Sequence, residues 1–235
     1  YSSSVIIPQL AQEQLGYTAL LAGLILSPGG LVVLFLIPIV GRLLPRVQTR
    51  FIIAFGFFFM GCALSWAYFM ITPGLDFYTL ALIRITQTAA LAFLFVPTST
   101  IAYSTLPKEV NNDASALYVM FRNLAGSIGI SLVTAYQRES VQTNRTLLVH
   151  NLTPLNPAYQ QTLAHVQSSL EAMGRTHAVA HQQALGWMNQ MLNGQAAILS
   201  YMDVFAISAV AAFAVVPLAF LFAPTKAGGR GAPAH

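Results

Sequence analysis

Five apolar segments, each long enough to cross a lipid bilayer, constrain the fold of this chain most. A transmembrane helix needs about 20 predominantly apolar residues. The segments lie at residues 18–40, 51–71, 77–101, 114–136 and 198–223. They are too long for barrel strands and do not alternate with period two, and in hydrocarbon a helix satisfies its own backbone groups. The sequence therefore predicts an all-α integral membrane protein.

The composition agrees with this fold class and argues against binding of nucleic acid. Hydrophobic residues make up 56% of the chain and charged residues 8%, whereas a soluble domain has about 25% charged residues. The mean hydropathy is +0.64. The net charge of +4 comes from scattered charges between the apolar segments, without a basic patch, so nucleic acid is not an expected partner. The single cysteine, Cys62, lies inside an apolar segment and forms no internal disulfide.

The same pattern divides the chain into five regions. Residues before Pro8 are too few to span a bilayer and are typical of the end of a helix whose beginning is missing. We expect the end of this helix and an outer loop at 1–17, four spans within 18–136, an outer segment at 137–197, a last span at 198–223 and a tail at 224–235.

The distribution of cations predicts the orientation in the membrane. Arg42, Arg46 and Arg50 lie between the first two spans, whereas the next connection, 72–76, has no cation. Cytoplasmic loops carry the excess of Lys and Arg, so the arginine loop is predicted to be cytoplasmic. Alternation then places 137–197 outside and the C-terminal tail in the cytoplasm.

Two arginines lie within predicted spans, Arg84 in the third and Arg122 in the fourth. A cation near the bilayer centre costs about 2.5–3.5 kcal/mol on insertion scales, so it faces a cavity or a partner, or its side chain reaches toward the interface. Asp203 lies at a depth similar to that of Arg84, and the two side chains could neutralise each other. Arg122 has no carboxylate at its depth, so it faces water or a partner outside this chain.

Small residues follow Arg122 on the fourth span. Ala125, Gly126 and Gly129 include a small-xxx-small pair, which lets another helix approach closely. Such a face serves static packing or a helix that slides against its neighbour, and the sequence leaves both interpretations open.

Three stretches resemble one family of membrane transporters. The most specific, at 106–129, reads LPKEVNNDASALYVMFRNLAGSIG and resembles the signature of the fourteen-helix drug/proton antiporters of the major facilitator superfamily, the EmrB/QacA type. A second stretch, at 8–30, reads PQLAQEQLGYTALLAGLILSPGG and is similar to the connection between the first two helices of that family's C-terminal half. The third, GRLLPR, resembles the second copy of the cytoplasmic loop motif, which here includes Gly41, Arg42, Arg46 and Arg50.

The resemblance implies that the chain is the C-terminal six-helix half of such a transporter, with five complete spans and the end of one. The N-terminal half, with the family's membrane carboxylates, is then missing. The third and fourth spans correspond to cavity helices, and the second and fifth to peripheral ones. The implied cavity candidates are the polar Arg84, Gln87, Tyr118, Arg122 and Asn123 with the apolar Phe93 and Phe121.

The implied function is proton-coupled efflux by alternating access, with amphipathic or cationic drug-like compounds as substrates. The implied partners are the lipid bilayer, protons, the N-terminal half and a periplasmic adaptor protein of a tripartite pump in the inner membrane. An enzyme is not expected, because HExxH, GxSxG, a phosphate loop and paired membrane carboxylates are all missing from the sequence. The alternative is a non-transporting membrane scaffold that binds partners through its outer segment.

Within the outer segment, apolar residues recur at helical spacing in two series. The residues are Tyr159, Leu163, Val166, Leu170 and Met173, then His177, Ala180, Ala184, Trp187 and Met191. This seam predicts amphipathic helices that either pack on each other or bind the adaptor. His177 and His181 have the spacing to share a metal, but no third ligand has clear spacing, so no metal or cofactor is predicted. Asn144 and Asn151 match glycosylation acceptors, which function only in a secretory pathway.

Overall fold

The computed structural model describes residues 2–104, 111–150, 152–153 and 156–221. Its elements are α1 (Ser2–Glu13), α2 (Ala19–Leu43), α3 (Thr49–Met70), α4 (Phe77–Ser104), α5 (Asn111–Val149), α6 (Pro157–Ala172), α7 (His177–Leu218) and the short 3-10 helix η2 (Ala219–Leu221). Five of these helices, α2 to α5 and α7, are long and apolar enough to cross a membrane. The all-α membrane fold predicted from the sequence is confirmed.

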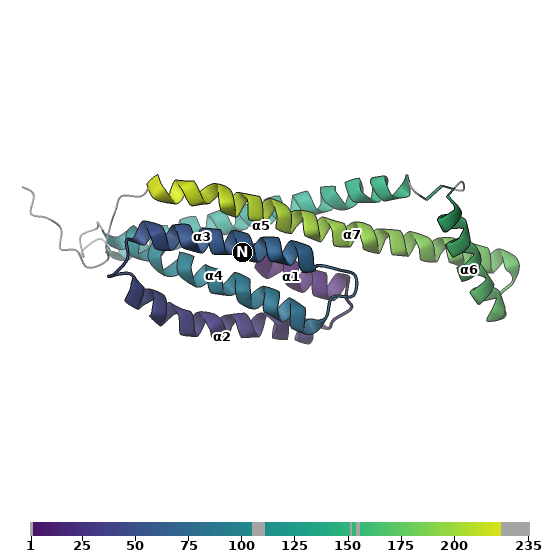
Figure 1. Ribbon diagram of the computed structural model, residues 1–235, viewed down its shortest axis with the longest axis horizontal. Helices are drawn as coiled ribbons and strands as arrows, with labels where there is room; N and C mark the ends of the chain where they lie inside the picture. The colour runs from purple at the N-terminus through teal and green to yellow at the C-terminus, as the bar shows by residue number, and fades with distance from the viewer. Residues whose placement is uncertain (1, 105–110, 151, 154–155, 222–235) are drawn as a thin grey trace, which may run out of the picture.

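The helices form an elongated bundle (Figure 1). Helix α4 packs between α2 and α3, and α7 packs against both α3 and α5. Helices α5 and α7 run on together beyond the ends of α1 to α4, and α6 lies across α7 near their far end (Figure 1). The predicted tail at 224–235 and residues 105–110, between α4 and α5, lie outside the described residues.

Local sequence explains where α2 and α4 begin. The hydroxyl of Thr18 accepts a hydrogen bond from the backbone N–H of Leu21, at 3.3 Å, and so caps α2. Just before α4, the Thr79 hydroxyl donates a hydrogen bond to Asp76, which lowers the pKa of that exposed carboxyl below its ordinary value. The backbone carbonyl of Asp76 also accepts from the N–H of Leu80. Each helix therefore starts at a polar residue that satisfies exposed N–H groups.

Glycines allow the helices to approach closely at two contacts. A Cβ atom at Gly29 of α2 would lie 2.6 Å from Oγ1 of Thr88 on α4. A Cβ atom at Gly61 of α3 would lie 2.7 Å from the ring of Phe213 on α7. Neither position accepts a larger residue without movement of a neighbouring side chain or helix, as is typical of helix contacts in membranes.

Helix α1 contributes to the main apolar core of the bundle. Its Ile6 and Ile7 are buried together with Tyr201 and Phe205 of α7. The hydroxyl of Tyr201, whose side chain is fully buried, donates a hydrogen bond to Glu13 at 3.1 Å and is also hydrogen-bonded to the side chain of Gln137. This polar group joins α1, α5 and α7 at the end of α1.

Helices α5 and α7 extend beyond the spans expected from the sequence. α5 has 39 residues and α7 has 42, which correspond to about 58 Å and 63 Å of helix, whereas a bilayer core is about 30 Å thick. The expected fourth span ended at 136, but the helix continues through 137–149. The outer seam after Gly174 and the last span form one continuous helix.

The predicted seam is correct in part. Ala180 and Ala184 are buried on α7, and Leu163 and Val166 of α6 are half-buried. Trp187 and Met191 of the predicted seam are 45% and 50% exposed, so the described residues cover them only in part. The buried series continues instead at every fourth residue, through Met188, Leu192 and Ala196. Met173, at the end of the first series, is also exposed.

Candidate functional site

A cavity of about 560 Å³ opens between α4 and α5, beside the beginning of α1. Apolar and aromatic side chains form most of its wall, with three hydroxyl groups and one cation. The lining residues are Ser4, Phe57, Leu91, Leu94, Phe95, Thr98, Tyr118 and Arg122. The size and composition of the cavity are those of a site that can hold a small apolar molecule and orient it through a few polar groups.

Arg122 is the charged residue of this cavity. Its guanidinium carbon lies 5.1 Å from the centre of the Phe95 ring, a distance at which a cation and an aromatic face attract each other. Nε of Arg122 is buried without a hydrogen-bond partner among the described residues. Among the described residues, no Asp or Glu side chain lines the cavity, so the guanidinium gives this lining a positive wall.

Hydroxyl groups lie close to this cation. Oγ1 of Thr98 is 3.5 Å from the Tyr118 hydroxyl, and it also donates to the backbone carbonyl of Leu94 at 2.6 Å. Thr98 belongs to α4 and Tyr118 to α5, so the two hydroxyls connect the helices across the cavity. They can donate to or accept from a polar group on a bound molecule.

Arg84 occupies a different position from the one expected. Its guanidinium donates hydrogen bonds to the hydroxyls of Ser3, at 3.1 Å, and Ser4, at 2.9 Å. The suggested pairing with Asp203 is wrong, because Asp203 accepts hydrogen bonds from Ser140 and, at 2.8 Å, from Asn144 of α5. Arg84 does not line the cavity, but it holds Ser4, which does.

The other predicted cavity residues are not brought together. Gln87 is 1% exposed and both polar atoms of its amide lack a hydrogen-bond partner among the described residues. Phe93 packs edge-on against Phe55 of α3, with ring centres 5.2 Å apart, and so lies away from the cavity. Phe121 and Asn123 are exposed on α5. Of the seven candidates, Tyr118 and Arg122 line the cavity.

Helical spacing could have identified the residues that were missed. Leu91, Phe95 and Thr98 follow Arg84 at intervals of seven, four and three residues, so they share one face of α4. Phe93 lies on the opposite face by the same rule. Phe57 and Leu94 also line a second cavity of about 270 Å³ beside Ser3 and Ile6.

The residues of the predicted loop motif lie around the turn from α2 to α3, and the small residues lie on α5. Gly41 and Arg42 lie near the end of α2, Arg46 is exposed in the turn, and the Arg50 guanidinium lies over the Phe51 ring at 5.1 Å. Gly126 is buried and Ala125 is exposed. A Cβ atom at Gly129 would meet no atom within 4 Å, so a helix that packs there would come from outside the described chain.

The remaining sequence candidates are the histidine pair for a metal and the two glycosylation acceptors. Among the described residues, no group of three His, Cys, Asp or Glu side chains is placed to hold a metal ion. Asn144 lies inside α5, and its side-chain amide donates to Asp203 and to Ser140, at 3.1 Å. Asn151 lies outside the described residues.

These features describe a multi-pass helical membrane protein with an apolar cavity between α4 and α5. Residues 1–130 match the family model described as Major Facilitator Superfamily, and the chain belongs to this superfamily of transporters. No solved structure matches the chain.

Relatives resemble the chain over nearly its whole length. It is 35% identical to the multidrug export protein EmrB of Escherichia coli K12, over all of this chain and 44% of the relative. It is 32% identical to EmrB of Haemophilus influenzae, over 88% of this chain and 39% of the relative. It is 24% identical to the fatty acid resistance protein FarB of Neisseria gonorrhoeae, over 96% of this chain and 43% of the relative. The chain thus spans less than half the length of these relatives.

Proposed function

We propose that this chain is the C-terminal six-helix half of a proton-coupled multidrug exporter that works by alternating access. The observation that carries the proposal is the cavity between α4 and α5, with its apolar wall and the single cation of Arg122. The names of the EmrB relatives support export of drugs, and the family supports transport. In alternating access, a second half closes the cavity from the other side.

The lining residues favour one class of substrate. An aromatic or aliphatic body would contact Phe57, Leu91 and Phe95, and an acidic or hydrogen-bond-accepting group would meet Arg122. The charge of this cavity opposes cationic compounds, which would need acidic residues from the other half. We therefore propose amphipathic compounds with a neutral or anionic polar group as substrates, in agreement with the fatty acid resistance named for FarB.

The proposal is tested by export from cells that carry the full-length protein. The probes are 8-anilinonaphthalene-1-sulfonate, an aromatic anion, and ethidium, an aromatic cation. A hydrogen bond to a charged group contributes about 1.5–3 kcal/mol, so Arg122→Ala should weaken binding of the anion about 10- to 100-fold and lower its export. Arg122→Lys keeps the charge but not the planar contact with Phe95, and should fall between wild type and Arg122→Ala.

Arg138→Ala is the matched control, because Arg138 is an exposed arginine on the same helix. It should export both probes like wild type. Equal export of the anion by wild type, Arg122→Ala and Arg122→Lys would refute the role of Arg122. If Arg122→Ala loses export of ethidium but keeps export of the anion, the cavity serves cations.

The proposal extends to location and partners. The protein would lie in the inner membrane with its C-terminus in the cytoplasm, and the outer parts of α5 and α7 with α6 would meet a periplasmic adaptor in a tripartite pump. The chain by itself should insert into membranes without exporting either probe, since it supplies one wall of the site. The alternative, a non-transporting scaffold, would be favoured if the full-length protein binds an adaptor but exports neither probe.

A further inference from the structure

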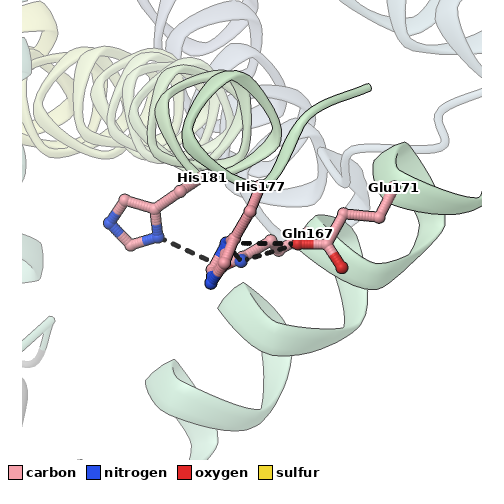
Figure 2. Close-up of polar contacts among 4 residues, drawn as sticks. All are labelled: Gln167, Glu171, His177 and His181. Carbon is pink, nitrogen blue, oxygen red and sulfur yellow. Dashed lines mark hydrogen bonds and ion pairs between the residues drawn. The ribbon is translucent and has the colours of Figure 1, made fainter. Parts of the chain in front are cut away.

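Four polar side chains join α6 to α7 at the far end of the molecule (Figure 2). Gln167 lies at the centre of the group. Its Nε2 is 3.0 Å from Oε1 of Glu171 and 2.7 Å from Nδ1 of His177, and its Oε1 is 3.1 Å from Nδ1 of His181. A carboxylate only accepts hydrogen bonds, so the amide nitrogen must be the group that faces Glu171.

Nδ1 of His177 has two neighbours that require opposite protonation states. Gln167 Nε2 can donate only to an Nδ1 without a proton. Oε1 of Glu171, 3.3 Å from the same Nδ1, can accept only when that nitrogen carries a proton. The ring therefore has one partner when it is neutral and another when it is charged.

We infer that this group is a pH-sensitive clasp between α6 and α7. Imidazole is the side chain that changes charge between about pH 5 and pH 8. When its ring is neutral, His177 accepts a hydrogen bond from Gln167, and when its ring is protonated, His177 forms an ion pair with Glu171. His181 donates to the Gln167 oxygen in both states, so the clasp changes partners without opening.

The distribution of charges around the clasp leaves Glu171 as the acid that pairs with a protonated His177. Glu171 is the single acid on α6 and on residues 177–197 of α7, so it can neutralise one of the two rings. The other residues that can carry a charge on the elements around the clasp are His165 on α6, Arg175 in the turn, and Arg145 and His150 at the end of α5. Arg145 is held by Asn193, at 2.8 Å, and by Asn189, at 3.2 Å.

The exchange also alters a groove between the two helices. Gln160, Gln167 and His181 are the polar lining residues of a cavity of about 410 Å³, and Leu163 and Leu185 are among its apolar ones. When Gln167 releases His177, one N–H of its side-chain amide becomes available to water or to a molecule bound in this groove. The inference concerns the contact of α6 with α7 and does not depend on the proposed transport activity.

The test is solid-state NMR of the full-length protein in lipid bilayers, labelled with ¹⁵N at His and Gln side chains. Between pH 7.5 and 5.5, the Gln167 side-chain amide resonance should shift together with the His177 ring resonances. His177→Gln should abolish the shift of the Gln167 amide. The control His165→Gln removes an exposed histidine of α6 outside the group and should leave that shift unchanged.

Two results would overturn the inference. One is a Gln167 amide resonance that stays constant while His177 changes its charge. The other is an unchanged pH response of Gln167 in the His177→Gln variant.

Discussion

The contact between α2 and α4 at Gly29 allows a quantitative prediction. A Cβ atom there would lie 2.6 Å from Thr88 Oγ1, 3.1 Å from Thr88 Cβ and 3.4 Å from Cγ of Arg84. At the neighbouring Gly30 a Cβ atom would meet nothing within 4 Å. Replacement of either glycine by alanine brings the same gain in helix propensity, up to about 1 kcal/mol. The difference between the two variants therefore isolates the steric cost.

Added atoms in a tightly packed interior cost about 1–3 kcal/mol. We expect Gly29→Ala to be less stable than Gly30→Ala by this amount, measured by equilibrium unfolding of the full-length protein in mixed micelles. Thr88→Ala removes the hydroxyl at 2.6 Å and leaves the nearest contact at 3.1 Å, so it should reduce the difference. Equal stability of the two glycine variants, or no rescue by Thr88→Ala, would refute the close approach of α2 and α4.

Three other predictions concern orientation, the polar contact of α1 and the outer helices. A cysteine at Arg46 should resist an impermeant thiol reagent applied to intact cells and a cysteine at Ser168 should react; the reverse pattern would contradict the orientation. Tyr201→Phe should lower the free energy of unfolding by about 0.5–1.5 kcal/mol, because it removes the hydrogen bond that the buried hydroxyl donates to Glu13, and unchanged stability would show that the bond contributes nothing. The double variant Leu163→Ser and Val166→Ser should raise hydrogen exchange in α6 while α3 stays protected, whereas unchanged exchange would mean that α6 does not depend on its packing against α7.

The spans could be predicted from sequence because length and apolar composition are local properties. The extension of α5 could also have been found, since residues 137–149 contain no Gly or Pro to end the helix that the apolar span starts. Their polarity favoured a loop instead. In α7, the helix continues through Gly186 and Gly194, although glycine is unfavourable in a helix interior.

The partners of the buried polar groups could not be predicted in the same way. Arg84 bonds to Ser3 and Ser4, which lie about 80 residues away in the sequence, and equal depth in the membrane suggested Asp203 instead. Depth does not determine which helices are neighbours or which way a side chain points. For Phe93, the aromatic side chain suggested a cavity wall, although its phase on α4 placed it on the opposite face.

Protection of a cysteine by a bound compound tests the cavity most directly. Thr98→Cys places the thiol on the cavity wall of α4, and Ser99→Cys places it about 100° round the same helix, outside the lining residues. In the full-length protein, saturating 8-anilinonaphthalene-1-sulfonate should slow modification of the cysteine at position 98 by a permeant maleimide several-fold. It should leave the cysteine at position 99 unaffected. Equal rates with and without the compound at both positions would contradict a substrate cavity between α4 and α5.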